Sequence, residues 1–125
     1  MRGGKLWFAG MVMAVALLAA GRSDAGPNLG TFSWKLEPFN SIVTLTVVQE
    51  GPVFMLAGFV NDGGPRLHPT TGVAFSNPDG TVGIGLTSIY PGGVVVHTEA
   101  TLPSAATPSG SWTNSFDESG DFALQ

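Results

Sequence analysis

Residues 77–102 read NPDGTVGIGLTSIYPGGVVVHTEATL, and this stretch decides the fold. It contains two runs, residues 81–89 and 94–102, in which larger and smaller or apolar and polar residues alternate with a period of two. Successive side chains of an extended strand point to opposite faces, so this period is typical of β-strands. Asn77-Pro78-Asp79-Gly80 places proline second in a four-residue turn and ends on a glycine suited to positive φ. Together with Pro91-Gly92-Gly93 between the two runs, it predicts consecutive antiparallel strands joined by tight turns.

The same pattern continues on both sides of this stretch. Six more strand-like runs are expected, at residues 31–36, 41–49, 53–60, 73–76, 111–116 and 121–124. Further tight turns are expected at Glu50-Gly51 and Glu118-Ser119-Gly120, and longer irregular connections at Asn61–Thr71 and Leu102–Gly110. No segment of this region carries a sustained apolar stripe with a 3.6-residue period, so we expect no substantial helix.

About eight short strands joined by consecutive tight turns predict an all-β fold, a small antiparallel up-and-down (meander) barrel. Closure is favoured because it removes the exposed edges of the sheet. A β-sandwich is the alternative. An eight-stranded barrel has an interior that side chains fill or that holds one small ligand.

The first 25 residues predict a secretory signal peptide. Arg2 and Lys5 precede the uncharged apolar run Leu6–Ala20. As a helix this run spans roughly 22 Å, short of the ~30 Å core of a bilayer. Small residues follow it, so we expect cleavage after Ala25 and a secreted or periplasmic protein. An uncleaved membrane anchor is the alternative.

Residues 26–125 then form a single acidic domain. Its fixed cations are Lys35 and Arg66 against eight carboxylates, which gives a net charge of −6. Nucleic acid is excluded as a partner because phosphate contacts need clustered Lys and Arg, and an anionic membrane surface is disfavoured. The absence of cysteine excludes disulfides, thiolate zinc sites, iron–sulfur clusters and a cysteine nucleophile.

The two tryptophans of this domain are the candidate ligand contacts. Trp34 shares its strand face with Phe32, and Trp112 shares its face with Asn114 and Phe116. Both faces are expected to point into the barrel, where the rings would form the walls of a pocket for a small apolar ligand and Asn114 its polar anchor. The alternative is that the same side chains simply fill a solid core.

His97 and Glu99 lie two residues apart, so both point to one face of their strand. This pair could exchange protons, or could hold a metal ion together with His68 from the long connection. The alternative is a solvated outer face. Because no Gly-x-Ser-x-Gly elbow, calcium loop or phosphate-binding loop is present, we predict no catalytic residues, no cofactor and a non-enzymatic protein.

Two stretches resemble the calycins, the group that contains lipocalins and avidins. These are Gly30-Thr31-Phe32-Ser33-Trp34 and Gly110-Ser111-Trp112-Thr113-Asn114. Calycins carry Gly-x-Trp on the first strand, whereas here it lies near the C-terminus. No biotin- or lipid-contact residue is therefore carried over.

A wider likeness covers nearly all of residues 26–125. Residues 30–34, 43–49, 77–86 and 96–101 resemble a family of uncharacterised bacterial secreted domains. Members often carry two cysteines, near the positions of Asn40 and of the loop 61–64, and this chain has neither. The resemblance implies the fold and export, and it implies no particular function.

The sequence thus predicts an exported binding or structural barrel. The expected partner is a small apolar ligand held near Trp34 and Trp112. The alternative is a protein–protein interaction module, such as an inhibitor or envelope accessory, that uses the connection Asn61–Thr71 and exposed Val and Thr faces.

Overall fold

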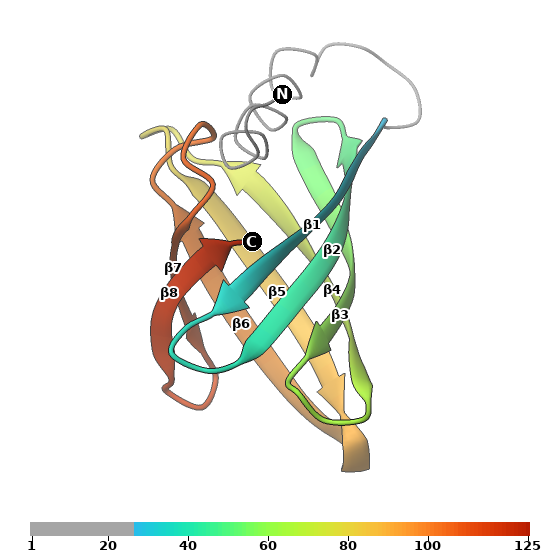
Figure 1. Cartoon of the computed structure of the whole chain (residues 1–125). Coiled ribbons are helices and arrows are strands. Elements are labelled where there is room, and N and C mark those ends of the chain that lie inside the picture. Colours follow the sequence, from blue (N-terminus) through green and yellow to red (C-terminus); the bar gives the residue numbers. More distant parts are fainter. Residues whose placement is uncertain (1–26) are drawn as a thin grey trace.

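The computed structural model describes residues 27–125, which form a closed barrel of eight antiparallel strands in sequence order (Figure 1). The strands are β1 (Asn28–Leu36), β2 (Ser41–Glu50), β3 (Val53–Asn61), β4 (Leu67–Ser76), β5 (Val82–Tyr90), β6 (Val94–Leu102), β7 (Gly110–Asn114) and β8 (Ser119–Leu124). The predicted up-and-down barrel is confirmed. The sandwich alternative is excluded, because β8 pairs back onto β1. The expected signal peptide and its cleavage point after Ala25 lie outside the described residues.

The strands alternate in direction, so the connections divide between two ends of the barrel. The mouth end carries the turns at residues 37–40, 62–66, 91–93 and 115–118, and it lies at the bottom of Figure 1. The capped end carries the turns at residues 51–52 and 77–81 and the loop 103–109. The helical content of the described residues is one 3-10 turn, Pro91–Gly93, so the expectation of no substantial helix is confirmed for this region.

The predicted glycine turns form for the expected reasons. Gly51 has φ 62° and precedes Pro52, whose ring fixes a negative φ, so this pair makes the two-residue hairpin loop between β2 and β3. Gly80 has φ 93°, and its N–H donates to the Asn77 carbonyl at 2.9 Å. These turns fix which residues of neighbouring strands face each other.

The predicted start of the fourth strand was wrong. The strand begins at Leu67, not at Val73, so the expected connection Asn61–Thr71 shortens to residues 62–66. Pro69 hid this strand, since proline cannot donate to a sheet ladder. It is tolerated because β4 pairs there only with β3, opposite Phe59, while the pairing with β5 begins at Thr70.

The predicted last turn was also misplaced. β7 ends at Asn114 rather than Phe116, and Ser119 and Gly120 belong to β8. The Asn114 side-chain oxygen accepts hydrogen bonds from the backbone N–H groups of Phe116 and Glu118, at 2.9 and 3.0 Å. An asparagine that satisfies its own turn in this way ends the strand early.

Four glycines bend strands over their neighbours. Each occupies an inward-facing position, and a Cβ atom there would overlap a backbone carbonyl of an adjacent strand or turn. They are Gly58 in β3, Gly72 in β4, Gly110 in β7 and Gly120 in β8. Glycines at such corners let a sheet curve tightly enough to close.

The interior differs between the two ends. Toward the capped end it is filled by fully buried apolar side chains together with the buried polar side chain of Gln49 near the end of β2; the apolar ones include Trp34, Leu45, Phe54, Leu102 and Phe122. Toward the mouth end the buried side chains include four polar ones, His68, Thr70, Ser88 and Thr98. The candidate site lies in this polar half.

Candidate functional site

The two tryptophans point into the barrel as predicted, but they lie toward opposite ends of the barrel and make different contacts. Trp34 is 1% exposed and stacks on Phe122 with ring centroids 5.3 Å apart. Its Nε1–H donates to the Pro108 carbonyl at 2.8 Å, which ties the loop 103–109 down over the capped end. Trp34 therefore belongs to the filled core and does not line the cavity described below.

Trp112 lies in the mouth half. Its Nε1–H donates to the Glu37 carbonyl at 2.9 Å, and its ring packs at 6.0 Å against the ring of Phe39 from the β1–β2 turn. Because the indole N–H is committed to backbone, Trp112 offers only its apolar ring to the barrel interior.

The other three predicted ligand contacts, Phe32, Asn114 and Phe116, also lie in different places: one at the core, one at the cavity and one on an exposed turn. Phe32 is partly buried and packs against the core, with its ring 6.3 Å from that of Trp34. Asn114 lines the cavity, but its amide also holds the β7–β8 turn through the contacts to Phe116 and Glu118. Phe116 itself is 56% exposed on that turn. Of the predicted set, the structure brings Trp112 and Asn114 together at one cavity.

A cavity of about 420 Å³ opens at the mouth end, inside the barrel wall. Ligand sites in proteins commonly occupy roughly 300–1,000 Å³. Its walls combine three kinds of side chain. The apolar and aromatic ones are Leu36, Phe39, Val60, Tyr90, Val96 and Trp112; the neutral polar ones are Asn40, Ser41, Ser88, Thr98 and Asn114; and the charged ones are Asp62 and Glu118.

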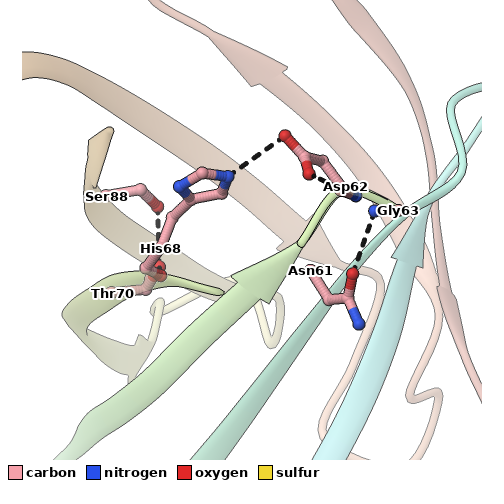
Figure 2. A network of polar contacts seen from close by, with 7 residues as sticks. Asn61, Asp62, Gly63, His68, Thr70 and Ser88 are labelled. Carbon is pink, nitrogen blue, oxygen red and sulfur yellow. Dashed lines mark hydrogen bonds and ion pairs between the residues drawn. The ribbon is translucent and has the colours of Figure 1, made fainter. Parts of the chain in front are cut away.

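A chain of polar contacts through His68 and Thr70 connects two residues that line this cavity, Asp62 and Ser88 (Figure 2). His68 Nε2 lies 3.1 Å from Asp62 Oδ2. An ionised carboxylate only accepts hydrogen bonds, so this nitrogen carries a proton and donates. Asp62 Oδ1 accepts from the Gly64 N–H at 3.1 Å. These two contacts hold the Asp62 carboxylate at the rim.

The chain continues from β4 to β5. Thr70 Oγ1 donates to the His68 carbonyl at 3.0 Å and lies 2.8 Å from Ser88 Oγ (Figure 2). Thr70 has one hydroxyl hydrogen, and the carbonyl takes it, so Ser88 must be the donor in the second contact. Ser88, which lines the cavity, therefore has lone pairs left to offer and no hydrogen.

Tyr90 and His68 close the barrel wall at the mouth. The pairing between β4 and β5 reaches only to Thr70 and Ser88, so the sheet ladder is open beyond them. The His68 and Tyr90 rings stack across this opening with centroids 3.9 Å apart. Side-chain stacking thus replaces backbone pairing where the cavity meets the surface.

The electrostatics of the site follow from these contacts. The Gly64 N–H, followed by the His68 ring, lowers the pKa of Asp62 below its ordinary 3.8, so this carboxyl is ionised at neutral pH. Burial raises the pKa of Tyr90 above 10.0, and the Asp62 and Glu118 carboxylates raise it further. Both acids therefore exert their fields on the same phenol.

The predicted metal set does not assemble. His68 is buried inside the barrel, whereas His97 and Glu99 are exposed on the outer face of β6. The reason is the strand period: His97 and Glu99 alternate with the inward Val96 and Thr98. Within residues 27–125 there is no group of three or more His, Cys, Asp or Glu side chains placed to hold a metal ion.

His97 has other neighbours on the outer wall. Its Nδ1 lies 3.1 Å from Thr87 Oγ1, and its backbone N–H donates to Ser115 Oγ at 3.1 Å. With Glu99, Thr113 and Asn114 it lines a surface hollow of about 230 Å³. The solvated outer face considered as the alternative is the arrangement found.

A second large hollow, of about 440 Å³, lies on the outer surface of β2, β3 and β4. Its lining is largely apolar, and it includes Val48, Met55 and Val73. Met55 and Val73 are 44% and 39% exposed. This groove is open to solvent, whereas the mouth cavity lies within the barrel.

Sequence reasoning missed the residues that give the mouth cavity its polarity. Asp62 and Tyr90 were not singled out, because nothing in their local sequence distinguishes them from ordinary turn and strand-end residues. Ser88 lies on the alternating run that decides the fold, at a position where Val82, Ile84 and Leu86 predict an inward side chain. The sequence signal that could have revealed the site was therefore Ser88, a polar residue at the next inward position after three apolar ones.

Comparison with protein-family models, curated proteins and solved structures returned no match. Within residues 27–125 no helix has the length and apolar character needed to cross a membrane.

Proposed function

We propose that this chain is a non-enzymatic binding protein that holds one small organic ligand in the mouth cavity. The observation that carries the proposal is the cavity of about 420 Å³ in a barrel whose other half is filled. Its wall joins aromatic and aliphatic surface to a few inward polar groups, the usual composition of a small-molecule site.

Adjacent residues of β6 provide a matched test. Val96 is 8% exposed and lines the cavity, while its neighbour Val95 is 42% exposed on the outer face. Val96→Phe places a ring in the cavity, and Val95→Phe places the same ring outside. The probes are three small aromatic compounds of different charge, namely 2-phenylethylammonium, 2-phenylethanol and 3-phenylpropanoate.

We expect at least one probe to bind the parent chain and Val95→Phe in titration calorimetry, and to lose affinity at least about tenfold in Val96→Phe. Thermal unfolding of both variants checks that they fold. If no probe distinguishes a folded Val96→Phe from Val95→Phe, the mouth cavity is not a ligand site.

We also propose that the protein is exported. Arg2 and Lys5, the apolar run Leu6–Ala20 and the small residues before the expected cut support this proposal. The intact mass of the exported protein should match residues 26–125. A mass that matches all 125 residues would contradict the cleavage.

A second candidate function is docking of another protein. The specific observation in its favour is the apolar groove over β2–β4, with Met55 and Val73 exposed along it. A photo-crosslinking residue at Val73 should then capture a partner that the same residue at Thr113, on the outer wall of β7, does not. Equal capture from both positions argues against docking at the groove.

A further inference from the structure

We propose that the ligand of the mouth cavity is a small organic ammonium ion, a protonated primary or secondary amine with an aromatic or aliphatic body. This inference rests on the proposed binding function and names its substrate class. It departs from the apolar ligand that the sequence suggested, because the cavity is acidic, rich in hydrogen-bond acceptors and walled by aromatic rings.

The first argument is charge. The charged side chains that line the cavity are Asp62 and Glu118, both carboxylates. The fixed cations of residues 27–125 are Lys35 and Arg66, and neither lines it; Arg66 is exposed on the same turn as Asp62. An anionic ligand would meet two like charges at the rim, whereas a cation meets opposite ones.

The second argument is hydrogen bonding. Ser88 has given its hydrogen to Thr70 and presents lone pairs. Asp62 and Glu118 are acceptors. Asp62 accepts from the Gly64 N–H and Glu118 accepts from the Asn114 amide, and each carboxylate has further lone pairs that can accept from a ligand. Thr98, Ser41 and Tyr90 carry hydroxyls, and Asn40 and Asn114 carry amides, so these groups both donate and accept and do not discriminate. An ammonium group brings N–H donors to the lining groups that only accept, which are Ser88, Asp62 and Glu118.

The third argument is the aromatic wall. Trp112 lines the cavity and has its N–H tied to the Glu37 carbonyl, so its ring offers the cavity no donor. Phe39 packs against it, and Tyr90 lies on the wall near Asp62. Aromatic rings attract cations through the negative faces of their π-systems, and they also cover the apolar part of an amine. The raised pKa of Tyr90, caused first by burial and then by both carboxylates, indicates that the acidic field extends from the rim to this ring.

The test compares three probes of nearly equal size. Titration calorimetry measures 2-phenylethylammonium, 2-phenylethanol and 3-phenylpropanoate against the full chain at low salt. We expect the ammonium ion to bind at least about tenfold more tightly than the alcohol and the carboxylate to bind most weakly. Added salt should weaken binding of the ammonium ion and leave the alcohol unchanged.

Three variants locate the effect. Glu118→Gln keeps an oxygen that can accept from Asn114 but removes the charge, and we expect about a fivefold loss for the ammonium ion and none for the alcohol. Ser88→Ala removes the acceptor and should cost a similar factor. Glu50→Gln, at the capped end in the last position of β2, is the matched control and should change neither affinity.

The results separate the two proposals. If the alcohol binds as tightly as the ammonium ion, or the carboxylate more tightly, the ammonium inference is overturned while the binding function stands. If Glu118→Gln and Glu50→Gln weaken the ammonium ion equally, the preference is not local to the mouth, and the inference is again overturned. If none of the three probes binds the parent chain, both proposals fail.

Discussion

The strongest test of the barrel geometry is the substitution Gly58→Ala. Gly58 faces inward in β3, where it pairs with Leu45 of β2. A Cβ atom at this position would overlap the Thr44 carbonyl oxygen and lie 3.1 Å from the Leu45 Cα atom. Both obstacles are backbone, so no side chain can rotate away, and β3 must move off β2.

The magnitude follows from what that movement breaks. Displacing β3 at this corner removes two or three ladder hydrogen bonds, at about 0.5–1.5 kcal/mol each. It also opens packing around the neighbouring core, so the expected loss of unfolding free energy is about 3–5 kcal/mol. Small domains are stabilised by only about 5–15 kcal/mol in total. For a domain of this length the loss corresponds to a melting temperature lower by roughly 20 °C.

Gly85→Ala is the matched control. Gly85 faces outward in β5, and a Cβ atom there meets nothing within 4 Å. Alanine restricts the unfolded chain more than glycine does, so this variant should be unchanged or more stable by about 0.4–1 kcal/mol. Urea and thermal unfolding, followed by tryptophan fluorescence, measure both variants. A cost below about 1 kcal/mol for Gly58→Ala, or an equal cost for Gly85→Ala, would refute the corner geometry.

Three further predictions concern the interior and the rim. Trp34→Phe leaves the Pro108 carbonyl without its donor, so we expect a loss of about 1–3 kcal/mol in urea unfolding and no change in probe affinity; an affinity change would place Trp34 at the site. Tyr90 is the single tyrosine of the chain, so its phenolate absorbance should titrate above pH 10.0, and Glu118→Gln should shift the midpoint downward; an unmoved midpoint would contradict the shared field. The pKa of Asp62 in the folded protein is depressed, so the ionised carboxylate stabilises the fold above about pH 3.8, and this stabilisation is lost as the pH falls through the folded-state pKa. The urea midpoint of the parent chain should therefore fall more between pH 6 and pH 3 than the midpoint of Asp62→Asn; equal declines would contradict this role of Asp62.

Much of the fold could be predicted because its signals are local. A period of two fixes which side chains share a face, and the glycine turns fix how neighbouring strands pair. The outward position of His97 and Glu99 and the inward position of both tryptophans follow from these two rules. Closure could be predicted because the sequence offers no helix to cover the two edge strands of an eight-stranded sheet, and pairing the edges with each other removes them.

The site could not be predicted to the same degree, because it depends on how strands are staggered around the barrel. Sequence period tells which face a residue occupies, but the stagger decides the level at which it lies along the barrel axis. Trp34 and Trp112 were assigned to one pocket for this reason, although they lie in opposite halves. Pro69 is a second case, since its tolerance depends on the pairing of β4 with β5 stopping at the next residue, Thr70.

The pairing of β1 with β8 joins the two ends of the described chain. It covers only three positions, Trp34 with Leu124, Lys35 with Ala123 and Leu36 with Phe122. A ribosome releases β1 first and β8 last, so the ring of strands closes only after residues 119–124 have emerged. Until then β1 keeps an unpaired edge, and the stack of Trp34 on Phe122 has no second ring. Closure of the barrel is therefore a late event that depends on contacts between its first and last strands, and until it occurs the open edges are exposed to aggregation.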